Sequence, residues 1–386
     1  MYFRLNCIVS IIFVSAAFNM ATLAVAKGEF LPTAVEGVTP AWCSQILKAP
    51  VASLKILSVR HGSSSTLIVH LEYDPSISKT SLPDRIFFKG GFNPELVAIA
   101  PSLLDTYRRE AEFYHYISPK LIASGMNLPK TWYSGIDSSS GQGIVVLEDL
   151  TTKACSFGSP TETWPLDRVL RGVEQLAILH AKTWKCAQDP SYKWLGANNG
   201  GLRGIILELT KPGPFNAVAP KNLEILDPDL DKTILLDSTR IVKAFKNLWD
   251  SDAAGDLDCF IHGDPHIDNT YMTTLGEPGF LDWQAASTGN CFHDVSYFVT
   301  SALTVEDRRA SEKQIVRHYL EILKNLRGPE VDWETGWYEY KKHLFHGYVL
   351  ALTQPGMQSQ ENIWALVGRY IPAIMDHSVI ELLEQL

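Results

Sequence analysis

Three side chains between residues 262 and 282 have the types and spacing that metal-dependent chemistry requires. Asp264 and Asn269 lie five residues apart within residues 262–269 (HGDPHIDN), and Asp282 follows the apolar residues 279–281. A positioned carboxylate can accept a proton from a hydroxyl group. Carboxylate and amide oxygens are also the ligands that Mg²⁺ prefers in proteins. This region therefore combines a candidate base with candidate ligands for a hard metal ion.

The spacing between Asp264 and Asn269 suggests a role for each residue. Protein kinases place their catalytic Asp five residues before an Asn that binds Mg²⁺. Transfer of a phosphoryl group from ATP needs such a base, ligands for Mg²⁺, a cation on the phosphates and a slot for adenine. We therefore predict that Asp264 is the catalytic base and that Asn269 and Asp282 bind Mg²⁺.

The candidate phosphate-binding residues lie upstream. Lys89 ends a predicted strand after apolar residues, and Glu110 interrupts an otherwise apolar helix face. Because a carboxylate on the buried side of a helix needs a cation, we predict that Glu110 pairs with Lys89 and holds it against the phosphates of ATP. Ser63, Ser64 and Ser65 form a predicted turn whose N–H groups and hydroxyls suit phosphate.

The elements that position these residues follow from the hydrophobic pattern. Leu67, Val69, Leu71 and Tyr73 alternate with Ile68, His70 and Glu72, which predicts a strand. Helix 103–117 carries Glu110 on its apolar face, whereas Glu112 and Arg108 are expected to form an ordinary surface pair. Together the amino-terminal elements predict a mostly antiparallel lobe, with strands at 54–59, 67–73, 85–89, 130–134 and 143–148 around helix 103–117. Backbone groups of Glu148 and Leu150, at the predicted join to a second lobe, are candidates for binding adenine.

The remainder of the chain has a mostly helical pattern. Residues 187–222 are rich in Pro, Gly and Asn, and we expect a long ordered loop or lid with short helical pieces. Residues 259–283 are predicted to form two short strands flanking a loop. The predicted helices are 164–184, 239–249, 294–303, 306–326, 333–352 and 361–385.

The ordered set of motifs resembles the aminoglycoside phosphotransferase and choline kinase superfamily, and most closely its ecdysteroid-kinase-like (CHK-kinase-like) branch. The matching segments are residues 88–89 (FK), 109–114 (REAEFY), 146–150 (VLEDL), 176–184 (LAILHAKTW), 262–269 (HGDPHIDN), 282–284 (DWQ) and 293–295 (HDV). They cover about residues 50 to 300. Pro265, where an apolar residue such as Leu is more usual, and the glycine-poor residues 62–66 depart from the family pattern.

This resemblance implies an α+β, protein-kinase-like bilobal fold, with a small antiparallel β-rich amino-terminal lobe and a larger, mostly helical carboxyl-terminal lobe. It implies ATP and Mg²⁺ as cofactors and the same roles for Asp264, Asn269, Asp282, Lys89 and Glu110. It also implies that Asp294 is a structural acid that supports the catalytic loop. We expect residues 27–150 to form the ATP-binding lobe and residues 151–386 the catalytic and substrate-binding lobe.

Composition restricts the partners and the compartment. The 386 residues carry a net charge of −9, and an acidic chain without a basic run is a poor nucleic-acid binder. The six cysteines have irregular spacing and are expected to be mostly buried thiols. Residues 1–26 resemble a signal peptide; an uncleaved membrane anchor and an extension from an incorrect start site are the alternatives. We favour a cytoplasmic catalytic domain over an anchored or secreted one, and a monomer or weak dimer.

Other functions remain open from the sequence. The chain could be a pseudokinase that binds a nucleotide or small molecule without turnover, although Lys89, Asp264, Asn269 and Asp282 are all present. It could also be a metal-dependent hydrolase that uses His262, Asp264, His266 and Asp282, although Gly263 and Pro265 disfavour a helical zinc site. We favour His262 as a structural hydrogen-bonding residue of the loop. For a phosphotransferase we expect the acceptor to be a small-molecule alcohol, such as a steroid, a secondary metabolite or an amino alcohol.

Overall fold

The computed structural model describes residues 30–76, 82–195 and 200–386. The signal-like residues 1–26 lie outside this part of the chain. The described residues form two compact units. The amino-terminal unit contains the described residues up to 123 together with Leu128–Cys155, and the carboxyl-terminal unit contains Ser124–Asn127 and Ser156–Leu386. Within the described ranges, no helix combines the length and the apolar character needed to cross a membrane.

The amino-terminal unit is built on a five-stranded antiparallel sheet with the strand order β1-β2-β3-β5-β4. The alternation predicted from residue 67 to 73 is confirmed, because Leu67, Val69, Leu71 and Tyr73 are all buried. The strands are β1 (Val51–His61), β2 (Ser65–Tyr73), β3 (Arg85–Gly90), β4 (Thr131–Ile136) and β5 (Gly143–Glu148). The helices are α1 (Pro40–Leu47), α2 (Pro94–Ile99), α3 (Leu103–Glu112) and α4 (Ser118–Ile122), with a π-helix, η3, over Phe113–Ile117.

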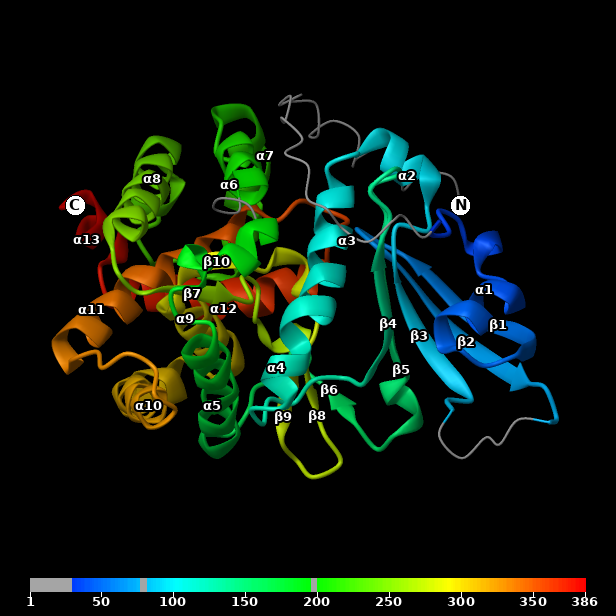
Figure 1. Ribbon diagram of the computed structural model, residues 1–386. Helices are drawn as coiled ribbons and strands as arrows, with labels where there is room; N and C mark the ends of the chain where they lie inside the picture. The colour runs from blue at the N-terminus through cyan, green and yellow to red at the C-terminus, as the bar shows by residue number, and fades with distance from the viewer. Residues whose placement is uncertain (1–29, 77–81, 196–199) are drawn as a thin grey trace. The chain divides into compact units, whose positions relative to one another are not determined.

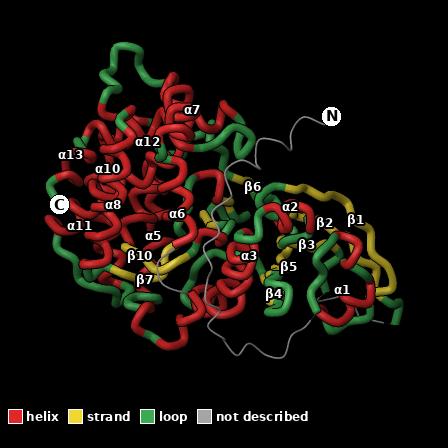
Figure 2. Tube along the Cα trace, turned by 90° about the horizontal axis from the view of Figure 1, so that it is seen from above, coloured by secondary structure: helices red, strands yellow, loops and turns green. Residues whose placement is uncertain are grey.

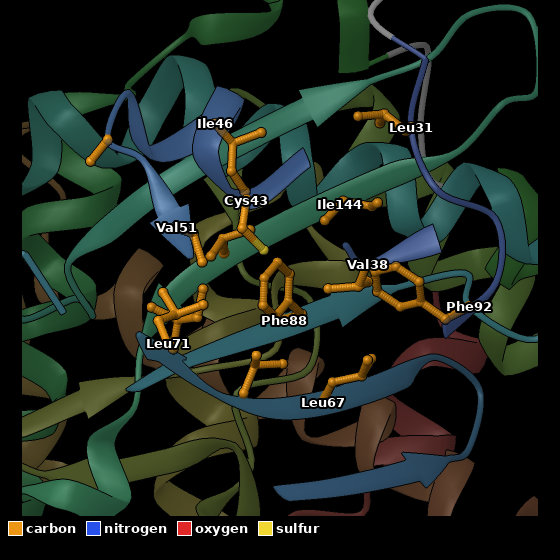
Figure 3. Packing of buried hydrophobic residues seen from close by; sticks show 14 of the residues in the cluster. Leu31, Val38, Cys43, Ile46, Val51, Leu67, Leu71, Phe88, Phe92 and Ile144 are labelled. Carbon is orange, nitrogen blue, oxygen red and sulfur yellow. The ribbon is translucent and has the colours of Figure 1, made fainter. Parts of the chain in front are cut away.

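The two faces of this sheet have different partners (Figure 1). Phe88 of β3 packs in a cluster with Cys43 and Ile46 of α1 and with Leu67 of β2, as Figure 3 shows. Because successive side chains of a strand point to opposite faces, Lys89 lies on the other face, where it meets Glu110 of α3. The period-2 pattern of a single strand thus separates a hydrophobic core from a charged group.

The carboxyl-terminal unit is mostly helical, with a few short strands (Figure 2). Its strands form a two-stranded sheet, β10-β7, and a three-stranded sheet, β6-β8-β9. They are β6 (Ser156–Phe157), β7 (Asp258–Ile261), β8 (Thr270–Met272), β9 (Pro278–Phe280) and β10 (Ser287–Asn290). The helices are α5 (Leu166–Lys182), α6 (Gly200–Leu209), α7 (Pro212–Asn222), α8 (Ser238–Ala254), α9 (Cys291–Ala302), α10 (Val305–Asn325), α11 (Trp333–His343), α12 (Gln360–Asp376) and α13 (Val379–Glu384).

Short 3-10 helices connect many of these elements in both units. In the amino-terminal unit they are η1 (Val35–Gly37) and η4 (Leu150–Thr152). In the carboxyl-terminal unit they are η5 (Cys186–Gln188), η6 (Pro190–Leu195), η7 (Leu223–Ile225), η8 (Ile234–Leu236), η9 (Ile267–Asn269), η10 (Trp283–Ala285) and η11 (Leu344–Leu352). The predicted helix 333–352 therefore becomes α11 followed by η11.

The predicted α+β, protein-kinase-like fold class is confirmed, with a β-rich amino-terminal unit and a mostly helical carboxyl-terminal unit. We expected a long ordered loop or lid with short helical pieces over residues 187–222; in the described part of this range the helical pieces predominate, because α6 and α7 occupy much of it. Pro212 and Pro214 lie in the first turn of α7, where backbone N–H groups have no partner within the helix and proline is tolerated. The predicted pair of strands in residues 259–283 is also incomplete, since β8 follows the loop and pairs with β9.

Candidate active site

Asp264 and Asn269 lie in the connection between β7 and β8 of the carboxyl-terminal unit. The side chain of Asp264 is 42% exposed. Asn269 ends η9, and its amide nitrogen donates to the backbone oxygen of Asp264 at 2.8 Å and lies 3.3 Å from the Asp264 Oδ2 atom. Because the amide is planar, its oxygen points away from Asp264. The loop thus presents an accessible carboxylate and an oriented amide oxygen.

Asp294 of α9 holds the start of this loop by its backbone. Its carboxylate accepts hydrogen bonds from the N–H groups of His262 at 2.6 Å and Gly263 at 3.0 Å. His180 of α5 lies 3.2 Å from the same carboxylate, and the side chains of His180 and Asp294 are fully buried. Burial alone would raise the pKa of Asp294, but the hydrogen bond from His180 and the nearby histidines lower it below its usual value. A buried, ionised carboxylate thus fixes the loop.

Gly263 is required by the shape of this turn. Its φ is +83°, and a Cβ atom there would lie 2.4 Å from the backbone oxygen of Ala285. Both the left-handed conformation and the close approach exclude other residues. Glycine therefore allows the chain to bend just before Asp264.

His262 connects the loop to the strand end that precedes Asp282. Its Nε2 atom donates to the backbone oxygen of Leu281 at 2.8 Å, and its Nδ1 atom accepts from the N–H of Asp264 at 3.3 Å. Burial lowers the pKa of His262, which agrees with a neutral ring carrying its proton on Nε2. Both ring nitrogens form hydrogen bonds with backbone groups, as expected of a structural hydrogen-bonding residue.

His266 has a different electrostatic setting from His262. Burial would lower its pKa, but the carboxylates of Asp264, Asp268 and Asp282 raise it above its usual value. Its Nε2 atom lies 3.6 Å from Oδ2 of Asp264. Three acidic side chains therefore gather around this ring, which is the environment that a cation prefers.

Asp282 adopts an unusual backbone conformation between β9 and η10. Its φ is +61° and its ψ is +73°, in the left-handed region. Such strain costs an L-residue on the order of 1–3 kcal/mol and is found mainly where a side chain must be aimed. The neighbouring Leu281 N–H donates to the backbone oxygen of Asn269 at 2.8 Å, which brings the chain segments of the two predicted metal ligands together. Their hard oxygen donors fit Mg²⁺ rather than a softer metal.

Two buried tyrosines lie near Asp264, and the sequence reasoning missed one of them, Tyr297. Tyr297 of α9 and Tyr370 of α12 are buried, and the ring centroids lie 4.9 Å apart. Burial, together with the nearby Asp264 carboxylate, raises the pKa of both hydroxyls well above the usual value. Tyr297 lies three residues after Asp294 on the same helix, which was the one available signal. The surroundings of Asp264 are thus more aromatic than its loop suggests.

In the amino-terminal unit, the structure brings Lys89 and Glu110 together. The Nζ atom of Lys89 lies 2.9 Å and 3.1 Å from the two carboxylate oxygens of Glu110, and the two side chains are 9% and 4% exposed. The contact fixes the direction of the ammonium group along the sheet. The role of Lys89 in nucleotide binding stays a prediction.

The serine turn is already partly engaged within the unit. Gly62 N–H donates to the backbone oxygen of Ser64 at 2.9 Å, and Ser63 accepts from the Tyr107 hydroxyl through its backbone oxygen at 2.5 Å. Ser65 is buried, and its hydroxyl lies 2.8 Å from Nδ1 of His61. The exposed part of this turn is therefore its backbone around Gly62 and Ser63 rather than the three hydroxyls together.

The Glu148–Leu150 segment also has part of its backbone occupied. Glu148 N–H donates to the backbone oxygen of Lys130 at 2.9 Å, and its side chain accepts from Lys130 N–H at 2.9 Å. The backbone oxygen of Leu150 accepts from Lys153 N–H at 3.1 Å. The adenine hypothesis therefore narrows to the Glu148 carbonyl and the Leu150 N–H.

The expected surface pair of Glu112 with Arg108 is wrong in one respect. The two side chains do meet, with Nη1 of Arg108 2.5 Å from Oε2 of Glu112, but Glu112 is only 3% exposed. Residues 109 to 112 are all buried, so the last turn of α3 is enclosed on every side. A pattern of polar residues cannot reveal this enclosure. Burial raises the pKa of Glu112 to about 7 despite the nearby guanidinium.

Comparison with known proteins places these features in context. The model of the phosphotransferase enzyme family matches residues 84–334, well over half of the chain. Comparison with curated proteins found no match.

Similar solved structures include the choline kinase LicA from Streptococcus pneumoniae, with 15% identity, a TM-score of 0.48, and coverage of 89% of this chain and 98% of that chain. The GDP and kanamycin complex of APH(2")-IIia has 16% identity and a TM-score of 0.45, with 89% and 97% covered. The Plasmodium vivax ethanolamine kinase has 13% identity and a TM-score of 0.41, with 86% and 83% covered.

Proposed function

The chain belongs to the phosphotransferase enzyme family, and we propose that it transfers the γ-phosphoryl group of ATP to a hydroxyl group of a small molecule. The observation that carries this proposal is the loop geometry: a 42% exposed Asp264 follows a turn that the buried Asp294 holds rigidly. A base must be both accessible and positioned, and this arrangement meets both needs.

We assign to Asp264 the contact with the hydroxyl group of the acceptor. Its carboxylate would accept or orient the proton of the acceptor hydroxyl. Two hydrogen bonds limit the movement of its backbone: Gly263 N–H donates to the Asp294 carboxylate, and the Asn269 amide donates to the Asp264 backbone oxygen.

Asn269 and Asp282 are the residues to which we assign Mg²⁺. Bound there, the ion would neutralise charge on the transferring phosphate. The amide of Asn269 is oriented by its bond to Asp264, and Asp282 is aimed by a strained backbone. Of the three acidic residues Asp264, Asp268 and Asp282, Asp282 is the one with a strained backbone, which supports a specific role for it.

The amino-terminal unit would bind the nucleotide. We assign Lys89, held by Glu110, to the ATP phosphates, and the backbone around Ser63, Ser64 and Ser65 to the same group. The Glu148 carbonyl and the Leu150 N–H would recognise adenine. A lysine held by a buried carboxylate has a fixed position and direction, which supports this assignment.

The acceptor would be a moderately apolar alcohol. The buried rings of Tyr297 and Tyr370 make the surroundings of Asp264 apolar, which supports such a molecule, for example a steroid or another secondary metabolite; an amino alcohol is also within the proposed class. Membership of the ecdysteroid-kinase-like branch, which the motifs suggest, is part of this proposal.

The test is turnover with a panel of alcohols in the presence of Mg²⁺ and ATP, detected as the mass of an added phosphate. Asp264→Asn should lower turnover by about 10³-fold or more while nucleotide binding persists. Asp268→Asn is the matched control, because Asp268 is exposed in the same loop. Full activity in Asp264→Asn would refute the assignment. Nucleotide binding without any phosphorylated product would favour the alternative, a catalytically inactive binding protein.

A further inference from the structure

A second group of metal-ligating side chains lies in the carboxyl-terminal unit, outside the catalytic loop. It consists of Asp252 near the end of α8, His343 at the end of α11, and His346 in η11. Each offers one ligand atom, and these three atoms lie within 4.8 Å of one another. The proposed phosphotransfer does not use any of these residues.

The hydrogen bonds of His343 are those of a metal ligand. Its Nδ1 atom lies 2.8 Å from the backbone oxygen of Glu339, which can only accept, so Nδ1 must carry a proton. Its Nε2 atom lies 3.0 Å from Oδ1 of Asp252. A neutral ring would therefore direct a lone pair at a carboxylate, which is repulsive. Either the ring is doubly protonated or a cation joins the two atoms. Metal-binding histidines almost always donate their other N–H in the way His343 does to Glu339.

His346 supplies independent support for the second explanation. Its Nε2 atom is buried and has no hydrogen-bond partner. Burial, with the nearby His293 and His343, lowers the pKa of His346 well below its usual value, so its ring is neutral. The ring stacks on His293, with centroids 3.8 Å apart, which fixes its plane. A neutral, fixed imidazole with an unused buried nitrogen is prepared to coordinate a metal.

The charged side chains around Asp252 affect how tightly this group would bind a metal ion. Lys342 Nζ lies 3.8 Å from Oδ1 of Asp252 but is hydrogen-bonded to Ser251 and Glu339. Burial would raise the pKa of Asp252, but His343, Lys342 and His293 keep it below its usual value, so the carboxylate is ionised. Arg203 also interacts electrostatically with the carboxylate of Asp252. The positive charges of Lys342 and Arg203 weaken the binding of a divalent ion at Asp252 without removing any ligand atom.

We propose that Asp252, His343 and His346 form a binding site for a divalent transition metal, with Zn²⁺ as the probe of choice. Two imidazoles and one carboxylate select Zn²⁺ and related ions over Mg²⁺, which takes oxygen ligands. With metal–ligand distances of about 2.0–2.1 Å, tetrahedral ligands lie about 3.3 Å apart. The 3.0 Å separation of His343 and Asp252 is close to this value, and an inward movement of at most about 1.5 Å brings the third ligand, now within 4.8 Å of the others, into range.

Such an ion would link three separate segments of the carboxyl-terminal unit. His293, which stacks on His346, immediately precedes Asp294, the residue that holds the catalytic loop. Bound metal would therefore stabilise the support of the loop without taking part in the reaction. The site stands on these contacts whether or not the phosphotransfer proposal is correct.

The experiment uses the full chain, treated with chelator, dialysed and incubated with Zn²⁺ in the absence of nucleotide. We expect one bound Zn²⁺ per chain by elemental analysis and a rise in Tm on adding Zn²⁺. His346→Ala should weaken Zn²⁺ binding by at least about 100-fold, since a direct ligand matters more than an outer partner whose loss costs about 10–100-fold. Because this variant also loses the stacking on His293, its metal-free Tm should fall somewhat, and Zn²⁺ binding is therefore measured by elemental analysis on the folded variant at a temperature below that Tm.

Two further variants make the outcome decisive. Asp252→Asn should lose the Zn²⁺-dependent rise in Tm, and His318→Ala, a histidine paired with Glu174 elsewhere, should retain it. Absence of stoichiometric Zn²⁺ in the wild type would overturn the site and leave His343 as a protonated partner of Asp252. Retention of Zn²⁺ in both His346→Ala and Asp252→Asn, with loss in His266→Ala, would overturn it in favour of the catalytic loop.

Discussion

The charged groups that we assign to catalysis are held in place in different ways in the two units. In the amino-terminal unit, Lys89 and Glu110 are buried and satisfy each other. In the carboxyl-terminal unit, the backbone of the loop is fixed by the buried Asp294, while the side chain of Asp264 is 42% exposed. The first arrangement uses charge to hold a side chain, and the second uses charge to hold a backbone. Substitutions should therefore affect folding in the first region and chemistry in the second.

The largest expected effect on stability is that of Lys89→Ala. It leaves the Glu110 carboxylate buried without its cation, which typically costs about 3–5 kcal/mol of unfolding free energy. Asp264→Ala, at an exposed side chain, should cost less than about 1 kcal/mol. Denaturant titration of both variants measures the difference.

A double variant tests the cause of that loss. Lys89→Met combined with Glu110→Gln removes both charges and should recover much of the stability, although nucleotide binding stays impaired. If Lys89→Ala proved as stable as the wild type, the buried pair would not be the element that holds the unit together.

A pH effect sharpens the same comparison at Glu112. Burial raises its folded-state pKa to about 7, above the ordinary value of 4.5. Between these values the folded state keeps a proton that the unfolded state has released. Its contribution to stability is therefore complete below about pH 4.5 and falls by roughly 1.4 kcal/mol per pH unit as the pH rises towards 7. Over the whole window the loss is about 3 kcal/mol.

Glu112→Gln provides the control for this titration. Its neutral amide removes the titrating group, so the variant should lack this pH-dependent loss between pH 5 and 7. Denaturant unfolding of the two proteins at several pH values gives the difference. Parallel pH profiles would show that Glu112 does not hold its proton in the folded state.

The smallest expected effect concerns the strained Asp282. Glycine adopts the left-handed conformation without strain, so Asp282→Gly removes the strain, whereas Asp282→Ala retains it. The glycine variant should be the more stable of the two by up to about 1 kcal/mol, because relief of strain is partly offset by the greater freedom of the unfolded chain. Thermal unfolding measures this difference. Equal stability would remove the argument that the backbone is strained to aim this side chain.

Local patterns in the sequence predicted much of the fold. The alternation around Leu67 and Val69 predicted β2, and the apolar residues before Lys89 predicted β3. Glu110 on an apolar helix face predicted a buried acid that needs a cation, and the structure provides Lys89. These predictions depend on periodicities of 2 and 3.6 residues, which are properties of short segments.

Other features were beyond such reasoning because they depend on which faces are enclosed. Glu112 has the sequence context of a surface acid but is buried, and α6 and α7 form in a region whose prolines and glycines favoured a loop. Tyr297 meets Asp264 only because α9, which also carries Asp294, packs beside the loop. Apart from the three-residue spacing of Asp294 and Tyr297, local spacing does not contain this information.

The amino-acid sequence alone therefore determines the set of chemical groups and the order in which they occur, together with the strands and helices that carry most of them. The tertiary structure decides which charged side chains are buried away from water and at which residues the backbone adopts an unusual conformation. Asp252 and His343 show this most clearly, since 91 residues separate two atoms that lie 3.0 Å apart. Burial and proximity are collective results of packing, and they set whether an ionisable side chain becomes a structural partner, a base or a metal ligand.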